Sequence, residues 1–388
     1  MIIGGGVMGL FTAYHASERV ERVVMLERGR IGDPMTASFG RTRSYRSDYL
    51  DPEYARLARE ALRLWEEFET RTGTPTLVRC GCMNIAKRSV TPDLTSTYGH
   101  LSHRVLKDLG VPSESLAGEA LRARFPYLDA DAGYIDVEGG VVNLPAVTAA
   151  LQRALAERGV RIVEGVGLSL VTRRGREIRV VTDAGEWASR SLVVTAGHGT
   201  NDVLGLLDGA LLQVPLTRDR PIEARYFTPP AESREQFASD AMPVIAYLDA
   251  GIYCHPIIDG LIDKVKIGYY HPPDLPRATT AIDSVMSFVD QCMPTLLDAR
   301  VEPVADVDGC DYDLVADDEF VLGAVPGFDG AYVGVGWRGT GYKFAPWVGR
   351  VLADLAIERA TAYDVARFDP ARFTKGSLHA GPAVSANA

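Results

Sequence analysis

The chain has 388 residues, of which 46% are hydrophobic, and a formal net charge of −10. This length and apolar content predict a globular protein of two domains, and the acidic charge argues against nucleic acid or an anionic membrane as a partner. No run of about 18 apolar residues is present, so no membrane span is expected.

The five cysteines stand at positions 80, 82, 254, 292 and 310, an odd number with irregular spacing. This pattern fits a reducing compartment better than a disulfide framework, and no basic and apolar leader opens the chain. We therefore predict a cytoplasmic protein. Cys80-Gly-Cys82 has no second pair at zinc-ligand spacing, so no metal site is expected.

The chain opens on a short buried strand, a glycine loop and a helix predicted from Met8 to about Arg19. Gly4, Gly6 and Gly9 form a G-x-G-x-x-G fingerprint, which allows a tight turn, close approach of a pyrophosphate and close packing of the helix. The positive end of that helix would face the phosphates. Because so few residues precede the first glycine, either the strand is short or native residues precede the first one.

Glu27 ends a second predicted strand at residues 23–26. An acid roughly 20 residues beyond the fingerprint usually binds a ribose hydroxyl, and Glu27 stands close to that spacing. The alternative is a glycine-rich turn in an ordinary βαβ unit. The combination of fingerprint and acid favours a dinucleotide site.

Asp51 and Pro52 predict the start of a helix, as its cap and its first residue, and Thr72-Gly73 marks its end. Residues 191–196 are nearly all apolar, which is typical of a central parallel strand buried on both faces. The other predicted elements are strands at 77–87 and 132–143, helices at 99–124 and 144–159, strands at 160–171, 177–182 and 186–190, a β-rich stretch at 213–272, a helix at 280–293, strands at 301–310, 319–325 and 330–335, and a last helix at 346–360.

The nucleotide-binding elements come from the start, the middle and the end of the chain, so a second domain must be inserted between them. This arrangement predicts an α/β (α+β) fold, with a Rossmann-like FAD-binding domain and an inserted antiparallel β-sheet substrate domain, by analogy with flavoproteins. We assign residues 1–78, 142–212 and 306–388 to the FAD-binding domain and residues 79–141 and 213–305 to the substrate domain.

Four further motifs carry a family resemblance. They are Ser38-Phe-Gly-Arg-Thr-Arg43-Ser-Tyr-Arg46, Val193-Val-Thr-Ala-Gly197, Lys266-Ile-Gly-Tyr-Tyr-His271, and Gly309-Cys310-Asp-Tyr312 followed by Gly334-Val-Gly336-Trp-Arg-Gly339-Thr-Gly341-Tyr-Lys343. Together with the glycine fingerprint, their order resembles the monomeric sarcosine oxidase family of D-amino-acid-oxidase-like FAD oxidoreductases, which includes N-methyltryptophan oxidases and the nikkomycin-pathway imine oxidase. The resemblance extends from Gly4 to about Phe373 and specifies the fold, but not the substrate.

The resemblance implies that Cys310 carries FAD covalently and that Lys266 lies over the flavin and activates oxygen, where a cation stabilises developing negative charge. The alternatives are a buried core cysteine and a solvated strand lysine. Lys264 and Lys266 share one face of their strand, and periodicity does not say whether that face meets water or a cavity.

The resemblance also implies that Arg46 and Lys343 hold a substrate carboxylate, that Arg43 lies near the other face of the flavin and that Tyr312 belongs to the catalytic site. Arg41, in the same basic cluster, is expected to face solvent. The implied cofactor-binding residues are Gly4, Gly6, Val7, Met8, Gly9, Glu27, Arg28, Ser38, Thr42, Arg43, Val166, Ala196, Gly197, Cys310, Gly336, Gly339, Thr340, Gly341, Tyr342 and Lys343.

Several residues depart from the family pattern and leave the substrate open. Cys254 stands where a tyrosine is expected, Tyr270 where a histidine is expected, and Phe39 replaces a histidine near the flavin. Four acidic residues surround the anchor cysteine on alternating faces, and either set would line the pocket or form a solvated edge. These acidic residues are Asp306, Asp308, Asp311 and Asp313.

We therefore predict a monomeric FAD-dependent oxidase that converts the C–N bond of a small secondary or cyclic amine or amino acid with a carboxylate to an imine, with O2 reduced to H2O2. A catabolic and a biosynthetic role are equally compatible with the sequence. His255 and His271 are candidate general bases. The alternatives are a dehydrogenase with another electron acceptor, a flavin hydroxylase and a non-catalytic flavin-binding subunit.

Overall fold

The computed structural model describes residues 1–219, 223–269, 281–303 and 312–374. The chain forms two compact units: unit 1 comprises Met1–Asp33, Leu151–Asp219 and Tyr312–Ala388, and unit 2 comprises Pro34–Ala150 and Arg220–Asp311. These units differ from the predicted domains chiefly at residues 34–78 and 142–150, which lie in unit 2. One boundary falls inside helix α5 (Leu144–Glu157), so no linker in the sequence marks it.

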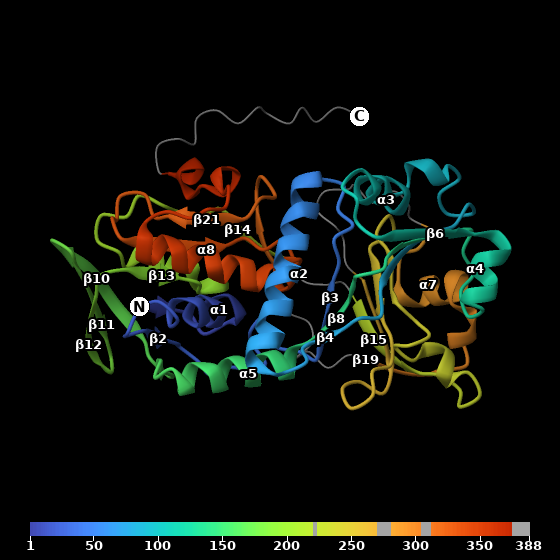
Figure 1. The fold of residues 1–388 in the computed structure, drawn as a ribbon, viewed down its shortest axis with the longest axis horizontal. Helices are drawn as coiled ribbons and strands as arrows, with labels where there is room; N and C mark the ends of the chain where they lie inside the picture. Colours follow the sequence, from blue (N-terminus) through green and yellow to red (C-terminus); the bar gives the residue numbers. More distant parts are fainter. Residues whose placement is uncertain (220–222, 270–280, 304–311, 375–388) are drawn as a thin grey trace. The chain divides into compact units, whose positions relative to one another are not determined.

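A six-stranded sheet with mostly parallel strands forms the centre of unit 1 (Figure 1). Neighbouring strands are parallel except β21 and β22, and β13 pairs with β1 on one side and β22 on the other, as predicted for a buried central strand. In spatial order the strands are β21 (Val321–Ala324), β22 (Ala331–Val335), β13 (Leu192–Val194), β1 (Ile2–Ile3), β2 (Val24–Leu26) and β9 (Arg161–Val163).

Two helices of unit 1, α1 (Val7–Ala16) and α8 (Ala345–Glu358), pack against each other (Figure 1). Their approach depends on Gly349, because a Cβ atom there would lie 2.5 Å from the Cβ of Phe11. The N- and C-terminal parts of the chain therefore pack together, as predicted from the order of the nucleotide-binding elements.

The prediction of one strand at 160–171 was wrong, because residues 161–163 form β9 in the central sheet and a separate strand begins at Leu168. Strands β10 (Leu168–Arg174), β11 (Glu177–Thr182) and β12 (Gly185–Ser189) form an antiparallel sheet with tight turns between them. The other elements are helix α6 (Thr200–Gly205) and the paired strands β14 (Leu216–Asp219) and β20 (Tyr312–Val315).

An eight-stranded sheet dominates unit 2, and all neighbouring strands are antiparallel except β16 and β5. This confirms the predicted sheet. In spatial order the strands are β19 (Arg300–Pro303), β15 (Glu223–Thr228), β18 (Val265–Tyr269), β17 (Ile252–His255), β16 (Val244–Tyr247), β5 (Cys82–Ala86), β7 (Ala132–Asp136) and β6 (Ser113–Ala117).

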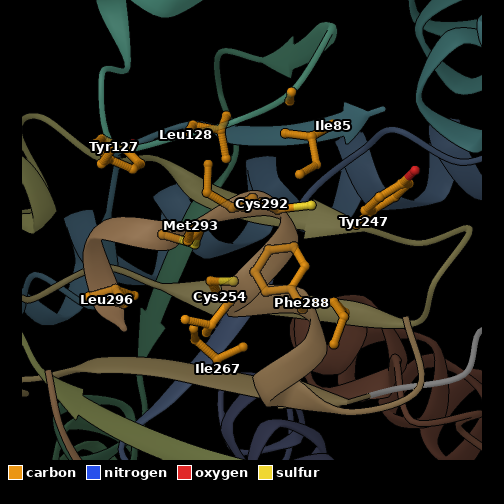
Figure 2. Packing of buried hydrophobic residues seen from close by; sticks show 14 of the residues in the cluster. Ile85, Tyr127, Leu128, Tyr247, Cys254, Ile267, Phe288, Cys292, Met293 and Leu296 are labelled. Atoms are coloured by element: carbon orange, nitrogen blue, oxygen red, sulfur yellow. The ribbon is translucent and has the colours of Figure 1, made fainter. Parts of the chain in front are cut away.

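One face of this sheet packs on helix α7 (Val285–Cys292). Figure 2 shows Phe288 and Cys292 of the helix with Cys254 and Ile267 of the sheet in this fully buried cluster. Cys254 and Cys292 are therefore core residues, and Cys254 does not share a strand face with its neighbours Tyr253 and His255.

Helix α2 (Pro52–Thr72) has the predicted boundaries. The Asp51 carboxylate accepts a hydrogen bond from the Glu53 amide, and Gly73 adopts a left-handed φ of 63° at the other end. A small sheet of β3 (Thr42–Tyr45), β8 (Gly140–Asn143) and β4 (Leu77–Val78) completes unit 2.

The prediction of one helix at 99–124 was wrong. The segment forms α3 (Tyr98–Asp108), then β6, then α4 (Gly118–Arg124). Gly110 ends α3 with a φ of 68°, and the residues that follow pair with β7. Pairing with a strand outside the segment overrides the local helical pattern.

Candidate active site

The glycine fingerprint of unit 1 leaves no room for side chains. Gly4 has a φ of 103°, and a Cβ atom on it would lie 2.4 Å from the carbonyl oxygen of Thr195. A Cβ atom on Gly9 would lie 2.0 Å from the carbonyl oxygen of Gly4. Gly6 is the N-cap of α1, and no side chain caps that end. This crowded loop before an uncapped helix fits the pyrophosphate of FAD.

Glu27 ties the fingerprint to the end of β2. Its Oε2 accepts a hydrogen bond from the Gly5 amide at 2.6 Å, and its Oε1 accepts one from the Gly29 amide at 2.7 Å. The Glu27 carbonyl accepts another from the Val166 amide at 3.1 Å. Each carboxylate oxygen has a further lone pair, so the carboxylate retains the capacity to bind a ribose hydroxyl.

We expect Glu27→Gln to weaken this site, because an amide NH2 group cannot accept from a backbone N–H. The loss of one charge-assisted bond costs about 1.5 kcal/mol, or roughly tenfold in FAD affinity. The flavin-to-protein ratio of the purified protein and its melting temperature test this. Glu177→Gln, in the exposed β10–β11 hairpin, is the matched control, and equal losses in both variants would contradict the role of Glu27.

Other predicted cofactor residues of unit 1 lie around the ends of β1, β13 and β22. A Cβ atom on Gly4 would lie 3.1 Å from the Cα of Ala196, and Gly197 adopts a φ of 54°. The loop after β22 reaches the same helix, because a Cβ atom on Gly341 would lie 3.2 Å from the Met8 side chain. Arg28 lies near the Ala196–Gly199 turn, 4.0 Å from a Cβ atom built on Gly199.

The loop from Gly336 to Lys343 is strongly turned. Gly336, Arg338 and Gly339 have φ values of 81°, 57° and 65°. The buried Lys343 donates from Nζ to the carbonyl of Thr340 at 3.3 Å, and Tyr342 is also buried. The roles of these residues and of Tyr312, at the start of β20, in binding flavin or substrate stay predictions.

Asp313 was not assigned a role in the cofactor site, and it does not form a solvated edge. It is buried in unit 1, and its Oδ2 accepts a hydrogen bond from the Gly336 amide at 3.0 Å, while its carbonyl accepts one from Arg338 N. Burial raises the pKa of Asp313 to about 6, although backbone hydrogen bonds act in the opposite direction. Asp313 therefore shapes the loop from Gly336 to Lys343.

Lys266 is one of the most deeply buried charged residues of unit 2, with 1% exposure. It lies directly opposite His255 in the β17–β18 pair, and directly paired residues share a sheet face. Lys264 instead forms an ion pair with Glu302 at 2.6 Å and remains 27% exposed. The solvated-strand interpretation therefore applies to Lys264 and not to Lys266.

His255 connects this sheet to β3. Its Nδ1 lies 2.8 Å from Thr42 Oγ1, and its Nε2 lies 2.8 Å from Ser44 Oγ, so one ring nitrogen donates and the other accepts. Burial, then Lys266 and Arg43, lower the pKa of His255 well below its ordinary value. The imidazole is neutral at physiological pH and a weak base, which disfavours it as a general base.

The three arginines of the basic cluster in unit 2 lie in different environments. Arg41 is exposed, as predicted, and donates to the Leu261 carbonyl. Arg43 donates to the carbonyls of Thr42 and Phe39 at 3.0 and 2.8 Å, which orders the turn that contains the half-buried Ser38.

Arg46 is buried in unit 2, and its Nη1 donates to the carboxylate of Asp48 at 2.7 Å. Burial opposes its charge, but Tyr98 and Asp48 raise the pKa of Arg46 above its ordinary value. Arg46 is therefore a buried cation with a fixed counter-ion.

Some predicted residues lie outside the described part of the chain. They are Cys310, Tyr270, His271, Asp306, Asp308 and Asp311. Among the described residues, no group of His, Cys, Asp and Glu has the geometry of a metal site, and none of the described helices has the length and apolar character needed to cross a bilayer.

Sequence reasoning assigned no role to Asp48 or Tyr253 and named His255 only as a candidate general base. Tyr253 shares a sheet face with His255, and a Cβ atom on the opposing Gly268 would overlap its ring. Period-two alternation could have placed these two residues together, because both flank Cys254. Nothing in the local pattern identifies Asp48 as the partner of Arg46.

Comparison of the sequence with protein families supports the FAD site described above. The family of FAD dependent oxidoreductases named DAO matches residues 1–355. The chain belongs to this family, and its FAD-binding assignment and fold class are confirmed.

The relatives are similar over nearly their whole length. Peroxisomal sarcosine oxidase of Homo sapiens is 29% identical over 400 residues, covering 98% of this chain and 97% of the relative. Monomeric sarcosine oxidase of Streptomyces avermitilis is 27% identical, covering 96% and 97%. The structure of glycine oxidase from Geobacillus kaustophilus superposes with a TM-score of 0.76 at 22% identity, covering 98% of both chains.

Proposed function

We propose that this protein is an FAD-dependent oxidase of a small secondary or cyclic amine or amino acid that carries a carboxylate. The substrate loses two electrons and two protons across its C–N bond and becomes an imine, and O2 takes up both to become H2O2. Water then hydrolyses the imine unless it is cyclic or conjugated. The bound FAD supplies the two-electron chemistry, and the protein supplies binding and electrostatics.

The observation that carries this proposal is the buried Lys266 in a chain of the FAD dependent oxidoreductase family. A fixed ammonium group stabilises negative charge as it develops on O2. Because such a lysine serves reaction with O2, its presence disfavours the alternative of a dehydrogenase that passes electrons to another acceptor. Names of relatives support the substrate class, because two of them are sarcosine oxidases.

Other residues of the proposed site bind the cofactor or the substrate. Glu27 and the glycine loop would hold the nucleotide, and Arg46 and Lys343 would hold the substrate carboxylate. The lowered pKa of His255 makes it a weak base, so we propose that the enzyme selects the neutral form of its amine. A monomeric state and a cytoplasmic location remain part of the proposal.

Covalent attachment of FAD at Cys310 is the first feature to test. Joining a thiol to a flavin methyl group as a thioether releases two electrons and two protons, which O2 takes up as H2O2. Acid precipitation should give a yellow pellet, and the intact mass should include FAD. Cys310→Ser should give a white pellet and a yellow supernatant, with Cys80→Ser as the control that keeps the yellow pellet. A white pellet from the wild type would contradict the attachment but leave the oxidase proposal standing.

A further inference from the structure

The hydrogen bonds that the Arg46 guanidinium group makes with the described residues all come from one nitrogen, Nη1. Nη1 donates to the Asp48 carbonyl at 2.6 Å, to Asp48 Oδ1 at 2.7 Å and to the Tyr98 hydroxyl at 3.2 Å. Within the described ranges, no hydrogen bond reaches Nε or Nη2. Arg46 as a whole is only 8% exposed, so its Nε–Nη2 edge carries two parallel N–H donors on a largely buried side chain.

Two aromatic rings fix the plane of the same group. The guanidinium carbon lies 4.6 Å from the centroid of the Tyr49 ring and 5.4 Å from that of Tyr98. The Tyr98 amide is bound in turn by both carboxylate oxygens of Asp249, at 3.0 and 3.1 Å. Arg46 therefore has little freedom to rotate.

Asp48 is itself held. Its Oδ2 accepts from the side-chain amide of Asn84, and Asp48 is buried. Asp136, another buried carboxylate close to Asp48, accepts a hydrogen bond from the Ser47 amide at 2.6 Å. Asp48 is thus the carboxylate that sets the position of the guanidinium group.

We infer that Asp48 is a positioning residue that determines ligand specificity: it occupies Nη1 of Arg46 and directs the Nε–Nη2 edge to bind a carboxylate through two parallel hydrogen bonds. This inference rests on the proposed function for the identity of the ligand. Such side-on binding favours planar carboxylates over neutral amides of equal size, because an amide offers only one acceptor.

The test measures binding without turnover. Propionate and propionamide are titrated into the holoenzyme, and the change in flavin absorbance gives each Kd. We expect the wild type to prefer propionate, and Asp48→Asn to weaken propionate binding about tenfold, since one charge-assisted contact is lost, with propionamide unchanged. Asp51→Asn, a neutral exchange at the α2 cap, is the matched control.

Three results would overturn the inference: no preference for propionate in the wild type, an unchanged propionate Kd in Asp48→Asn, or tighter propionate binding, which would mean that Asp48 competes with the ligand. If Asp48→Asn does not fold, Asn84→Ala keeps both charges and should still weaken propionate binding a few-fold; no change there would equally overturn it. A holoenzyme that binds propionate as expected but oxidises no amine would contradict the proposed function and not this inference.

Discussion

Lys266→Met is expected to slow the oxygen-dependent half of the reaction by roughly 100-fold, the usual effect of removing a preorganised charge that stabilises the transition state. The anaerobic half-reaction with an amine substrate should stay close to the wild-type rate, because Lys266 acts on O2. Methionine has a similar length and fills the buried site opposite His255 without placing a new charge there. Stopped-flow absorbance of the flavin separates the two half-reactions.

The control is Lys264→Met, two residues earlier with the same side-chain periodicity but only half-buried and paired with Glu302. It should change neither half-reaction. Equal slowing in both variants would show that only net charge matters, and an unchanged oxygen step in Lys266→Met would remove the role proposed for this lysine. A wild type that reacts slowly with O2 but quickly with a quinone would favour the dehydrogenase alternative.

Sequence predicts those parts of the fold whose determinants are local. The cap and stop of α2 lie within a few residues of its ends, so Asp51, Pro52 and Gly73 are sufficient to place it. The central position of β13 follows from a continuous apolar run. By contrast, β6 exists because β7 pairs with it, and that information is absent from the segment between Gly110 and Gly118.

The residues of the candidate site also fall into two groups, those that a local motif predicts and those that only long-range contacts determine. The glycine fingerprint and Glu27 are readable because the motif and its spacing encode one loop. The hydrogen bond between Ser44 and His255 joins residues 211 positions apart, so no local pattern predicts it. Lys264 and Lys266 share one periodicity, but β15 and β17 both pair opposite Lys266 and neither pairs opposite Lys264, so the burial of Lys266 depends on strands distant in sequence.

Gly9→Ala is expected to abolish FAD retention in purified protein. Alanine is often accepted at the third glycine of this fingerprint, but here the added Cβ atom would lie 2.0 Å from the Gly4 carbonyl oxygen and 2.8 Å from Thr195 Oγ1. Both neighbours are fixed, because Gly4 N donates to the Leu26 carbonyl at 2.9 Å and Thr195 N donates to the Ile3 carbonyl at 2.8 Å. Helix α1 must therefore move away from the sheet.

Overpacking of this kind costs roughly 3 kcal/mol, and the displaced helix end would no longer face the pyrophosphate. Flavin content after gel filtration and the melting temperature of the apoprotein measure the two effects. Gly205→Ala is the matched control, because it lies in helix α6 of the same unit with no atom within 4 Å of the added Cβ, and it should be neutral or slightly stabilising. A Gly9→Ala protein with full flavin content would mean that α1 packs less tightly than the structure shows. The assignment of the glycine loop to the pyrophosphate would then rest on Glu27 alone.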